Sequence, residues 1–283
     1  MANERTGGVA RELIRIDDPG DPRITEFRDI KERDLAGRQG RFIAEGTVVL
    51  RMAAAAHGAG SFEIEKILLL ENRVEGVRPI LDDIPADVPA YVASSTVLDA
   101  IAGFHLHRGI LALGRRVAEP DIDALIGRLP ERALVVAACG ISNHDNIGAM
   151  FRNAAAFGAD AVLLDETCCD PLYRKALRVS VGSVLSVPYA RGGTILSLLE
   201  TLAGRGLEIW ALSPSGETDL RDIPAAGGGI ALVTGTEGEG LPEAVMRSFR
   251  TARISQRPGL DSLNAATATG IALYEIARIQ EKI

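Results

Sequence analysis

Short apolar runs alternate with segments of helical periodicity through the C-terminal half of the chain. The apolar runs predict strands at 133–139, 161–164, 207–212 and 230–233. The periodic segments predict helices over 147–157, 172–178, 194–204, 243–249 and 262–280. Because strands that alternate with helices pair in parallel, this half is expected to be an α/β domain, a parallel sheet with helices on both faces.

The N-terminal half carries a smaller pattern of the same kind. Strands are expected at 64–70 and 109–114, a strand or turn at 41–46, and short strands or helices near 77–81, 89–93 and 96–101. Helices are expected over 24–40, which is rich in charge, and over 48–57, with Thr47 as N-cap and Gly58 at the end. We therefore expect a flexible arm (1–22), a small α/β domain (23–116), a linker (117–131) and the parallel-sheet domain (132–283).

Composition limits the class of protein. The chain is 47% hydrophobic and 24% charged, the balance of a globular protein, and no apolar run reaches the ~18–20 residues that span a bilayer. The N-terminus lacks the apolar core of a signal peptide, so a cytoplasmic protein without a membrane partner is expected. A net charge of −7 argues against non-specific coating of nucleic acid, which needs Lys and Arg. Two local clusters are expected to be solvated surface: Arg28, Lys31, Arg33, Arg38 and Arg41, and Arg247, Arg250, Arg253 and Arg257.

The cysteines and histidines do not predict a metal site. Cys139, Cys168 and Cys169 are odd in number and lack metal-site spacing, so we expect reduced, buried thiols. His105 and His107 could share one face of a strand, but two imidazoles without a third ligand make a poor zinc site.

Three separated segments of the C-terminal half carry the candidate chemistry. The first follows the strand at 133–139 and reads Asn146-Ile-Gly-Ala-Met-Phe-Arg152-Asn153. Asx residues are natural N-caps here, which accounts for Asn146 without a catalytic role. Arg152 is harder to explain, because a guanidinium on a helix of small residues needs an anion, a carbonyl or solvent.

The second segment, Thr234-Gly-Thr-Glu237-Gly-Glu-Gly240-Leu-Pro242, joins a strand to a helix. Its glycines permit close approach of a ligand, but their order, G-x-x-G-x-G, differs from that of a dinucleotide loop, and no Gly-Lys-Ser/Thr follows. Glu237 and Glu239 would repel a pyrophosphate. A ligand with little phosphate charge, such as S-adenosylmethionine, suits the loop better; a plain glycine turn is the alternative.

The third segment, Asp261-Ser-Leu-Asn264-Ala-Ala-Thr267, begins the last helix, and Asp261 or Ser262 is expected to cap it. The small residues of its first turns allow another backbone or a ligand to approach closely. Contact with a neighbouring helix would explain the same small residues.

Together these segments resemble the three motifs of the SpoU (TrmH-like) RNA 2′-O-ribose methyltransferases. Asp170–Gly182, with its R-x-S-x-G pattern, resembles the family's connecting segment. Phe42–Gly46 and His107–Ile110 are similar to the ribosomal-protein-like RNA-binding domain of many members. One departure is Ile254-Ser-Gln256, where the family commonly has I-P-M, which puts the cofactor contacts of that loop in doubt.

The resemblance implies methyl transfer from S-adenosylmethionine to a ribose 2′-hydroxyl of ribosomal or transfer RNA, with neither DNA nor a metal expected. The residues implied at the reaction centre are Arg152, Asn146, Glu237, Ser262 and Asn264. Those implied at the cofactor are Thr234, Gly235, Gly240, Ile254 and Leu263. Family proposals make Arg152 a base; because a neutral guanidine is costly to form, a clamp is favoured, with the proton passing to phosphate or water.

The resemblance also implies a SPOUT domain with a trefoil knot and a homodimer whose interface frames the site. No periodicity indicates a knot, and knots are rare in general. Two other classes are weighed. A non-catalytic RNA-binding protein with the same fold would explain the altered Ile254–Gln256 segment but not the other intact motif residues. A nucleotide-dependent oxidoreductase is disfavoured by the glycine order and by Glu237 and Glu239.

Overall fold

The computed structural model describes residues 11–28, 36, 39–102, 108–118, 121–224, 227–236, 238–257, 259 and 261–283. The chain divides into two compact units. The first comprises Met1–Val117 with Leu172–Arg174, and the second comprises Ala118–Pro171 with Lys175–Ile283.

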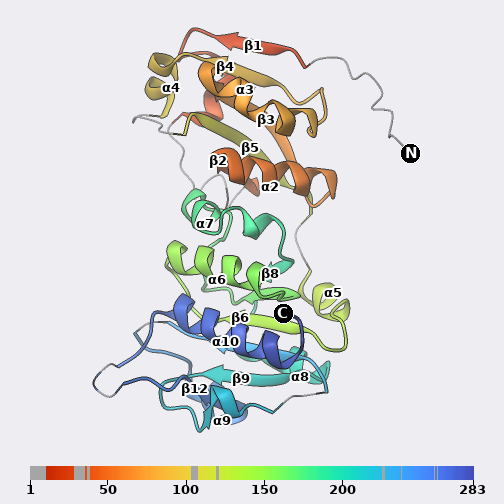
Figure 1. The fold of residues 1–283 in the computed structure, drawn as a ribbon, viewed down its shortest axis with the longest axis vertical. Helices are drawn as coiled ribbons and strands as arrows, with labels where there is room; N and C mark the ends of the chain where they lie inside the picture. Colours follow the sequence, from red (N-terminus) through yellow and green to blue (C-terminus); the bar gives the residue numbers. More distant parts are fainter. Residues whose placement is uncertain are drawn as a thin grey trace. The chain divides into compact units, whose positions relative to one another are not determined.

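The first unit is built on a mixed five-stranded sheet in the order β1-β4-β3-β5-β2 (Figure 1). Its strands are β1 (Leu13–Ile16), β2 (Arg41–Glu45), β3 (Phe62–Leu70), β4 (Ala90–Ala93) and β5 (Ile110–Arg116). Strands β1, β4 and β3 are parallel, and β5 is antiparallel to β3 and β2. Among the residues that the structure describes, this unit has helices α2 (Thr47–Gly58), α3 (Val74–Asp82) and α4 (Ser95–Ala102), with 3-10 turns η1 (Pro22–Phe27) and η2 (Glu71–Arg73).

Both faces of this sheet are covered. Alternate side chains of β5 point to opposite faces, so Leu111 and Leu113 join the apolar cluster beneath η1 and α4, which contains Phe27 and Leu98. Helix α2 lies on the other face against β2, β3 and β5. The expected small α/β unit therefore has its own core.

Two expectations for this half are wrong, and a third falls mostly outside the described residues. Leu13–Ile16, placed in the arm, forms β1 and pairs with β4, because its apolar residues complete the edge of the core. The helix-like stretch expected within 24–40 falls mostly on residues 29–35, 37 and 38, which lie outside the described residues; residues 24–27 belong to the 3-10 turn η1, and Ala36 and Gln39 are helical. Thr47 is the first residue of α2 rather than its cap, because Gly46 takes the N-cap position with φ +88°.

The second unit contains a seven-stranded sheet in the order β10-β12-β9-β11-β6-β7-β8, in which every neighbouring pair is parallel. The strands are β6 (Leu134–Ala138), β7 (Ala161–Leu164), β8 (Tyr189–Arg191), β9 (Glu208–Leu212), β10 (Thr218–Asp219), β11 (Ile230–Thr234) and β12 (Arg250–Arg253). The predicted parallel sheet is confirmed, with four of its strands at the expected places.

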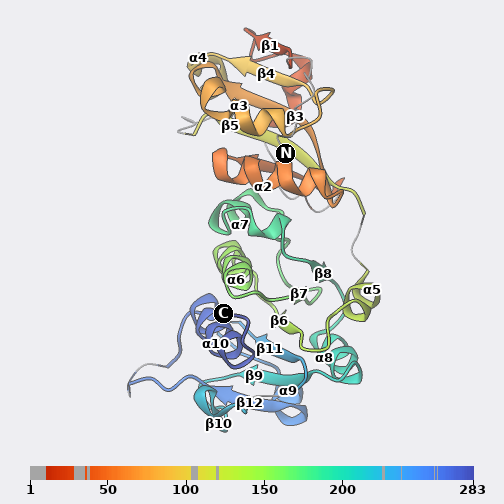
Figure 2. The ribbon, with the colours of Figure 1, turned by 45° about the vertical axis from the view of Figure 1, so that its right-hand side comes forward.

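Helices cover both faces of this sheet, as expected. They are α5 (Ile122–Gly127), α6 (His144–Ala156), α7 (Arg174–Val179), α8 (Ile195–Gly204), α9 (Glu243–Ser248) and α10 (Ala265–Ile279), with 3-10 turns η3 (Ser183–Leu185) and η4 (Leu220–Asp222). Helices α5, α8 and α9 share one apolar cluster with the sheet. Helix α10 packs against α6, β11 and β6, and Figures 1 and 2 both show α10 beside α6.

The strands that sequence reasoning missed are β8, β10 and β12. They span three, two and four residues, too few to give a period-2 signal. The last of them reads Arg-Thr-Ala-Arg and was assigned to a solvated basic cluster. Helix α5 lies in the segment expected to be a linker and is capped by Asp121, whose carboxylate accepts from the amide of Ala124. The trefoil knot stays a prediction from the family resemblance.

Gly148 lets α6 approach the 176–179 segment, which gives a test of this packing. A Cβ on Gly148 would lie 2.7 Å from the carbonyl oxygen of Ala176 and 2.9 Å from Cβ of Val179. Gly148→Ala should lower the free energy of unfolding in urea by about 1–3 kcal/mol through overpacking. Gly204→Ala is the matched control, because a Cβ there meets no atom within 4 Å. If both variants are as stable as the wild type, the close approach of α6 is wrong.

Candidate functional site

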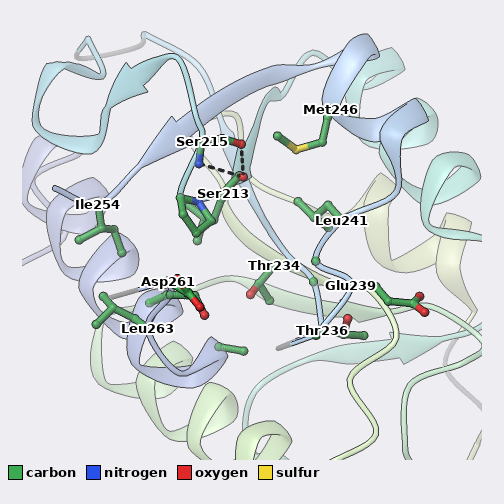
Figure 3. Close-up of a pocket in the computed structure, with 18 of the residues that line it drawn as sticks. Ser213, Ser215, Thr234, Thr236, Glu239, Leu241, Met246, Ile254, Asp261 and Leu263 are labelled. Atoms are coloured by element: carbon green, nitrogen blue, oxygen red, sulfur yellow. Dashed lines mark hydrogen bonds between the residues drawn. The ribbon is translucent and has the colours of Figure 1, made fainter. Parts of the chain in front are cut away.

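A pocket of about 970 Å³ opens at the carboxyl ends of β9, β11 and β12 (Figure 3). Ligands of open parallel sheets bind at this edge, and pockets of this size hold small molecules and cofactors. The described residues that line it come from four segments: 212–215, 234–243 with Met246, 252–256, and 261–268. Two of the three candidate segments therefore meet here, at one site.

The loop after β11 forms one wall. Thr234 is buried at the end of the strand, and Thr236 pairs with Gly240 across the loop in an isolated antiparallel bridge. This tight return requires glycine at two positions. A Cβ on Gly235 would lie 2.5 Å from the carbonyl oxygen of Gly240, and Gly240 itself has φ +71°. Glu237 lies outside the described residues.

The loop after β12 forms the opposite wall and contains the departure from I-P-M. Ser255 Oγ donates a hydrogen bond to Oδ2 of the buried Asp219, which also accepts from Arg221. These hydrogen bonds, the one from Arg221 first, hold the pKa of Asp219 well below its usual range, so the carboxylate stays an acceptor. Ile254 and Gln256 on either side line the pocket. The loop therefore has a polar anchor where the family commonly has proline.

Helix α10 begins where the third segment enters the pocket wall. Its N-cap is Asn264, whose Oδ1 accepts from the amides of Ala266 and Thr267 at 3.1 Å each. The expectation that Asp261 or Ser262 caps the helix is wrong, because those residues lie in the preceding loop and line the pocket. Because Asn264 caps the helix, the side chains of Asp261 and Ser262 are not needed for capping and can make other contacts.

A hydrogen bond joins the first segment to the third. Asn264 Nδ2 donates to Asn146 Oδ1 over 2.8 Å, across 118 residues of chain. Asn153 Nδ2 donates to the carbonyl of Ala266 over 3.0 Å. Asn146 is buried on α6, and the N-cap of α6 is Asn143, whose Oδ1 accepts from the amide of Asp145. The first segment is thereby fixed against the beginning of α10.

Arg152 occupies a different position from the other candidates. It lies on the exposed face of α6, does not line the pocket, and makes no hydrogen bond or ion pair with a described residue. Of the ten candidate residues, six line the pocket: Thr234, Gly235, Gly240, Ile254, Ser262 and Leu263. Asn146 and Asn264 form the pair behind it. The structure thus brings eight candidates together and leaves Arg152 facing solvent.

The charge of the pocket wall restricts its ligand. Glu239, Glu243 and Asp261 line it, and none of the described lining residues is basic. A phosphate-rich nucleotide would meet repulsion here, whereas a cationic sulfonium or ammonium would be attracted. Thr236 Oγ1 and Gln256 Oε1 are buried and lack a hydrogen-bond partner among the described residues. These two atoms are therefore available to form hydrogen bonds with a ligand. These features fit S-adenosylmethionine.

Sequence reasoning missed the lining residues after β9 and on α9. Ser213, Pro214 and Ser215 follow β9 and border the pocket, and Met246 of α9 borders it too. Figure 3 labels Ser213, Ser215 and Met246. The signal for the first group was present: Ser-Pro-Ser-Gly follows a predicted strand, and in a parallel sheet its carboxyl end adjoins those of the neighbouring strands.

Asp165 fixes the loop that leads from β6 into α6. Its carboxylate accepts from the amides of Gly140, Thr167 and Cys168. Cys139 and Cys168 are buried and free, as expected, and Cys169 is half-buried and free. Burial raises the pKa of the Cys139 thiol to about 12, so it is protonated at neutral pH and unsuited to nucleophilic chemistry.

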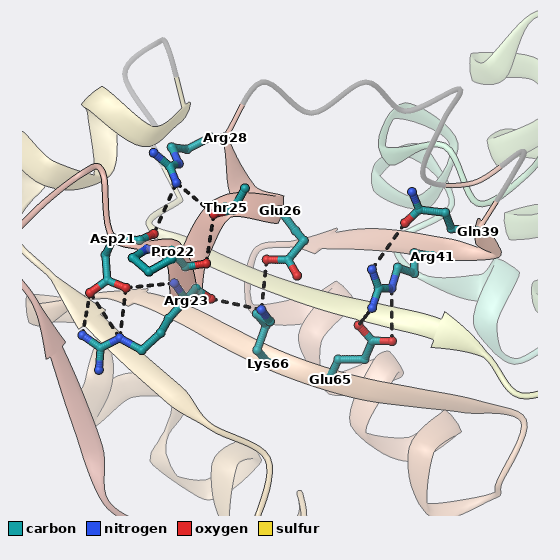
Figure 4. A network of polar contacts seen from close by, with 10 residues as sticks. All are labelled: Asp21, Pro22, Arg23, Thr25, Glu26, Arg28, Gln39, Arg41, Glu65 and Lys66. Atoms are coloured by element: carbon teal, nitrogen blue, oxygen red, sulfur yellow. Dashed lines mark hydrogen bonds and ion pairs between the residues drawn. The ribbon is translucent and has the colours of Figure 1, made fainter.

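Two cations of the first basic cluster are described, and both have partners (Figure 4). Arg41 pairs with Glu65 at 3.0 Å, and Lys66 beside it pairs with Glu26 at 2.9 Å. Arg28 donates to the carbonyl of Asp21 and to Thr25. Lys31, Arg33 and Arg38 lie outside the described residues.

The arginines of the second basic cluster, at 247–257, differ in the partners they contact. Arg247 pairs with Glu243 and Arg250 with Glu208, both on the exposed surface as expected. Arg253 instead donates to the carbonyls of Gly216 and Glu217 and holds a turn at the pocket rim.

Within the described part of the chain, no helix combines the length and hydropathy of a membrane span. The same residues include no group of three or more His, Cys, Asp and Glu that could hold a metal ion. His105 and His107 lie outside that part.

Comparison with known sequences identifies the class. Residues 133–274 match the SpoU rRNA Methylase family. The chain is 38% identical over 269 residues to an uncharacterized tRNA/rRNA methyltransferase of Mycobacterium bovis, with 92% of this chain and 90% of the relative covered. The protein therefore belongs to the SpoU family of RNA methyltransferases.

Solved structures agree on the fold. An AdoMet-bound rRNA methyltransferase from Sinorhizobium meliloti superposes with a TM-score of 0.80, covering 94% of this chain and 98% of that one, at 24% identity. A structure described as an RNA 2′-O ribose methyltransferase has a TM-score of 0.72 and 28% identity, covering 96% of this chain and all of that one. The α/β architecture with a parallel SPOUT sheet is thus shared along nearly the whole chain.

The Asn146–Asn264 bond should be measurable as a coupling energy. Asn264→Ala should lower the free energy of unfolding by about 1–2 kcal/mol, because it removes both the cap and this bond. In a double-mutant cycle with Asn146→Ala, measured in urea, the two effects should couple by about 0.5–1.5 kcal/mol. Thr194→Ala, which removes the cap of α8, should be additive with Asn264→Ala. Additivity of the asparagine pair would contradict the bond.

Proposed function

We propose that the protein transfers a methyl group from S-adenosylmethionine to a ribose 2′-hydroxyl of ribosomal or transfer RNA. The observation that carries the proposal is the acid-lined pocket at the carboxyl edge of the sheet, where the second and third segments meet. Family membership supports the reaction class. The relative described as a tRNA/rRNA methyltransferase and the neighbour described as a 2′-O ribose methyltransferase support the finer substrate and atom.

The pocket is the proposed cofactor site. Thr234, Gly235 and Gly240 form one wall of it, and Ile254 and Leu263 form the other, with apolar surface for an adenosine. When bound, S-adenosylmethionine supplies a methyl group on a positively charged sulfur. The carboxylates of the wall favour that charge over a phosphate.

The proposed reaction centre adjoins the Asn146–Asn264 pair. Asn264 holds Asn146 and caps α10, so we assign it to position the centre, with Ser262 as a contact for the ribose or its phosphate. Glu237 is assigned by the family motif. Arg152 is assigned as a clamp on the RNA phosphate rather than as a base, because a neutral guanidine is costly to form, and the hydroxyl proton passes to phosphate or water.

A homodimer is part of the proposal. Arg152 faces solvent outside the pocket of its own chain, so a second chain must frame the centre if Arg152 is to act there. Ile271 and Tyr274, one turn apart on α10, are 39% and 50% exposed, an unusual place for large apolar side chains. The ring centroid of Tyr274 lies 5.7 Å from that of Phe157, the C-cap residue of α6, so the apolar surface extends from α10 to the end of α6.

The first unit is the proposed RNA-recognition domain, in the cytoplasm. Arg51, Arg73 and Arg108 are exposed there and pair with no described residue, unlike the cations of Figure 4. Arg73 and Arg108 both lie beside Gly109. Unpaired cations are the groups that phosphate contacts require. The knot belongs to the proposal as the family's topology.

The well-formed pocket supports an enzyme over the alternative of a non-catalytic RNA binder. That hypothesis drew support from the altered Ile254–Gln256 loop. The Ser255–Asp219 bond provides the loop with an anchor, so loss of the proline does not imply loss of the cofactor site.

Arg152→Ala tests the assignment of the reaction centre. Methyl transfer to RNA should fall at least about a hundredfold, the size of effect seen when one preorganised charge stabiliser is removed. The affinity for S-adenosylmethionine, measured by calorimetry, should stay within about twofold, because Arg152 does not line the pocket. Arg128→Ala, at the exposed end of α5 on the other face of the sheet, is the matched control. Undiminished turnover of Arg152→Ala would refute the assignment.

A further inference from the structure

The turn after β9 places two hydroxyl groups on the wall of the pocket. Ser213 Oγ and Ser215 Oγ lie 3.0 Å apart, and the amide of Ser215 also donates to Ser213 Oγ over 3.3 Å (Figure 3). Both residues line the pocket. Neither belongs to the three segments that resemble the family motifs, so this polar spot has no role in the function described above.

The turn is held rigidly on β12. The amide of Ser213 donates to the carbonyl of Ala252 over 2.9 Å, and the amide of Gly216 closes the turn onto the carbonyl of Ser213 over 3.0 Å. A Cβ on Gly216 would lie 2.4 Å from the carbonyl carbon of Ala252, so only glycine permits this approach. Arg253 Nη1 adds a bond to the carbonyl of Gly216. The hydroxyl pair is therefore ordered before any ligand arrives, which lowers the entropic cost of binding.

The hydrogen-bonding capacity of the pair suits a diol. Each hydroxyl has one donor and two acceptor sites. The mutual bond uses one O–H, so the pair keeps one free donor and retains acceptor sites for a ligand. Two neighbouring ribose hydroxyls, each a donor and an acceptor, match such a mixed set. A carboxylate accepts hydrogen bonds but donates none. It would bind the one free O–H of the pair, and the remaining acceptor oxygens of the serines would then face its negative charge.

The rest of the pocket wall supports the same choice. Glu239, Glu243 and Asp261 line it and none of the described lining residues is a cation, so a carboxylate ligand group would lack a charged partner here. A neutral diol meets no such repulsion.

We propose that Ser213 and Ser215 bind the two ribose hydroxyls of the adenosyl cofactor and so fix the position of the adenosyl group in the pocket. The inference rests on the proposed function, because it assumes that an adenosyl ligand enters this pocket. It adds a third wall, the 213–216 turn, to the two walls formed by the second and third segments.

Calorimetry on the whole 283-residue chain tests the proposal with a stable ligand, S-adenosylhomocysteine, and its 2′-deoxy and 3′-deoxy forms. The wild type should bind at least one deoxy form about three- to tenfold more weakly, the loss expected for one hydrogen bond. Ser213→Ala and Ser215→Ala should bind the parent ligand more weakly by a similar factor. In these variants the penalty for the deoxy form should fall below about twofold, because its partner is already gone. Ser248→Ala, at the exposed end of α9, should behave as the wild type.

A deoxy penalty of the same size in wild type and both serine variants would overturn the proposal. A second ligand, 5′-methylthioadenosine, keeps the ribose but lacks the amino acid. The serine variants should weaken its binding by the same factor; if its binding is unchanged, the pair contacts the amino acid end and the proposal is wrong. A wild type with no affinity for S-adenosylmethionine or any of these ligands would instead overturn the proposed function itself.

Discussion

The site depends on how the side chain of Asn264 is used. One amide oxygen caps α10 through two backbone amides, and the amide nitrogen donates to Asn146 on α6. A single residue thus sets where the last helix begins and which face of α6 it meets. The loop that precedes α10 is then held between β12 and this cap, and that loop is one wall of the pocket.

The other end of this loop, which follows β12, is fixed by hydrogen bonds to a carboxylate and to backbone carbonyls. The family commonly has a proline in that part of the loop. Ser255 donates to the Asp219 carboxylate, and Arg253 donates to the carbonyls of the turn after β9. These contacts cross-link the ends of β10 and β12, neighbouring strands at the edge of the sheet. The result is a pocket whose walls are preorganised by short polar contacts and close glycines. Its wall carries carboxylates but no described cation, which favours a positively charged ligand.

Much of the architecture could be predicted from the sequence, because the buried strands 133–139, 161–164, 207–212 and 230–233 are apolar and clearly separated. The missed strand β12 is short, with arginine at each end, and takes its conformation from pairing with β9 and β10 rather than from its own pattern. β1 was missed for a similar reason: its partner, β4, lies more than seventy residues away. Pairing with distant strands determines the conformation of such segments, and this pairing cannot be recognised from the local sequence pattern.

The candidate site shows the same division. The motif residues of the pocket could be named in advance from glycine placement and family resemblance. The cap of α10 could not, because Asp261, Ser262 and Asn264 are all good caps, and only the fold selects the residue that also reaches Asn146. The strand that precedes Ser213 and Ser215 was predicted, so the position of these serines at a strand end could be known. The order of strands, which places the end of β9 beside β11 and β12, could not be predicted.

The central claim is methyl transfer to a ribose hydroxyl, and its most direct test uses the chemistry of that hydroxyl. The protein would be incubated with methyl-labelled S-adenosylmethionine and with ribosomal and transfer RNA from cells that lack it, and the RNA then hydrolysed in alkali. Alkaline cleavage needs a free 2′-hydroxyl, so ribose methylation leaves the label in alkali-resistant dinucleotides. We predict label in that fraction. Label confined to mononucleotides, which indicates base methylation, or no incorporation into either RNA, would contradict the claim.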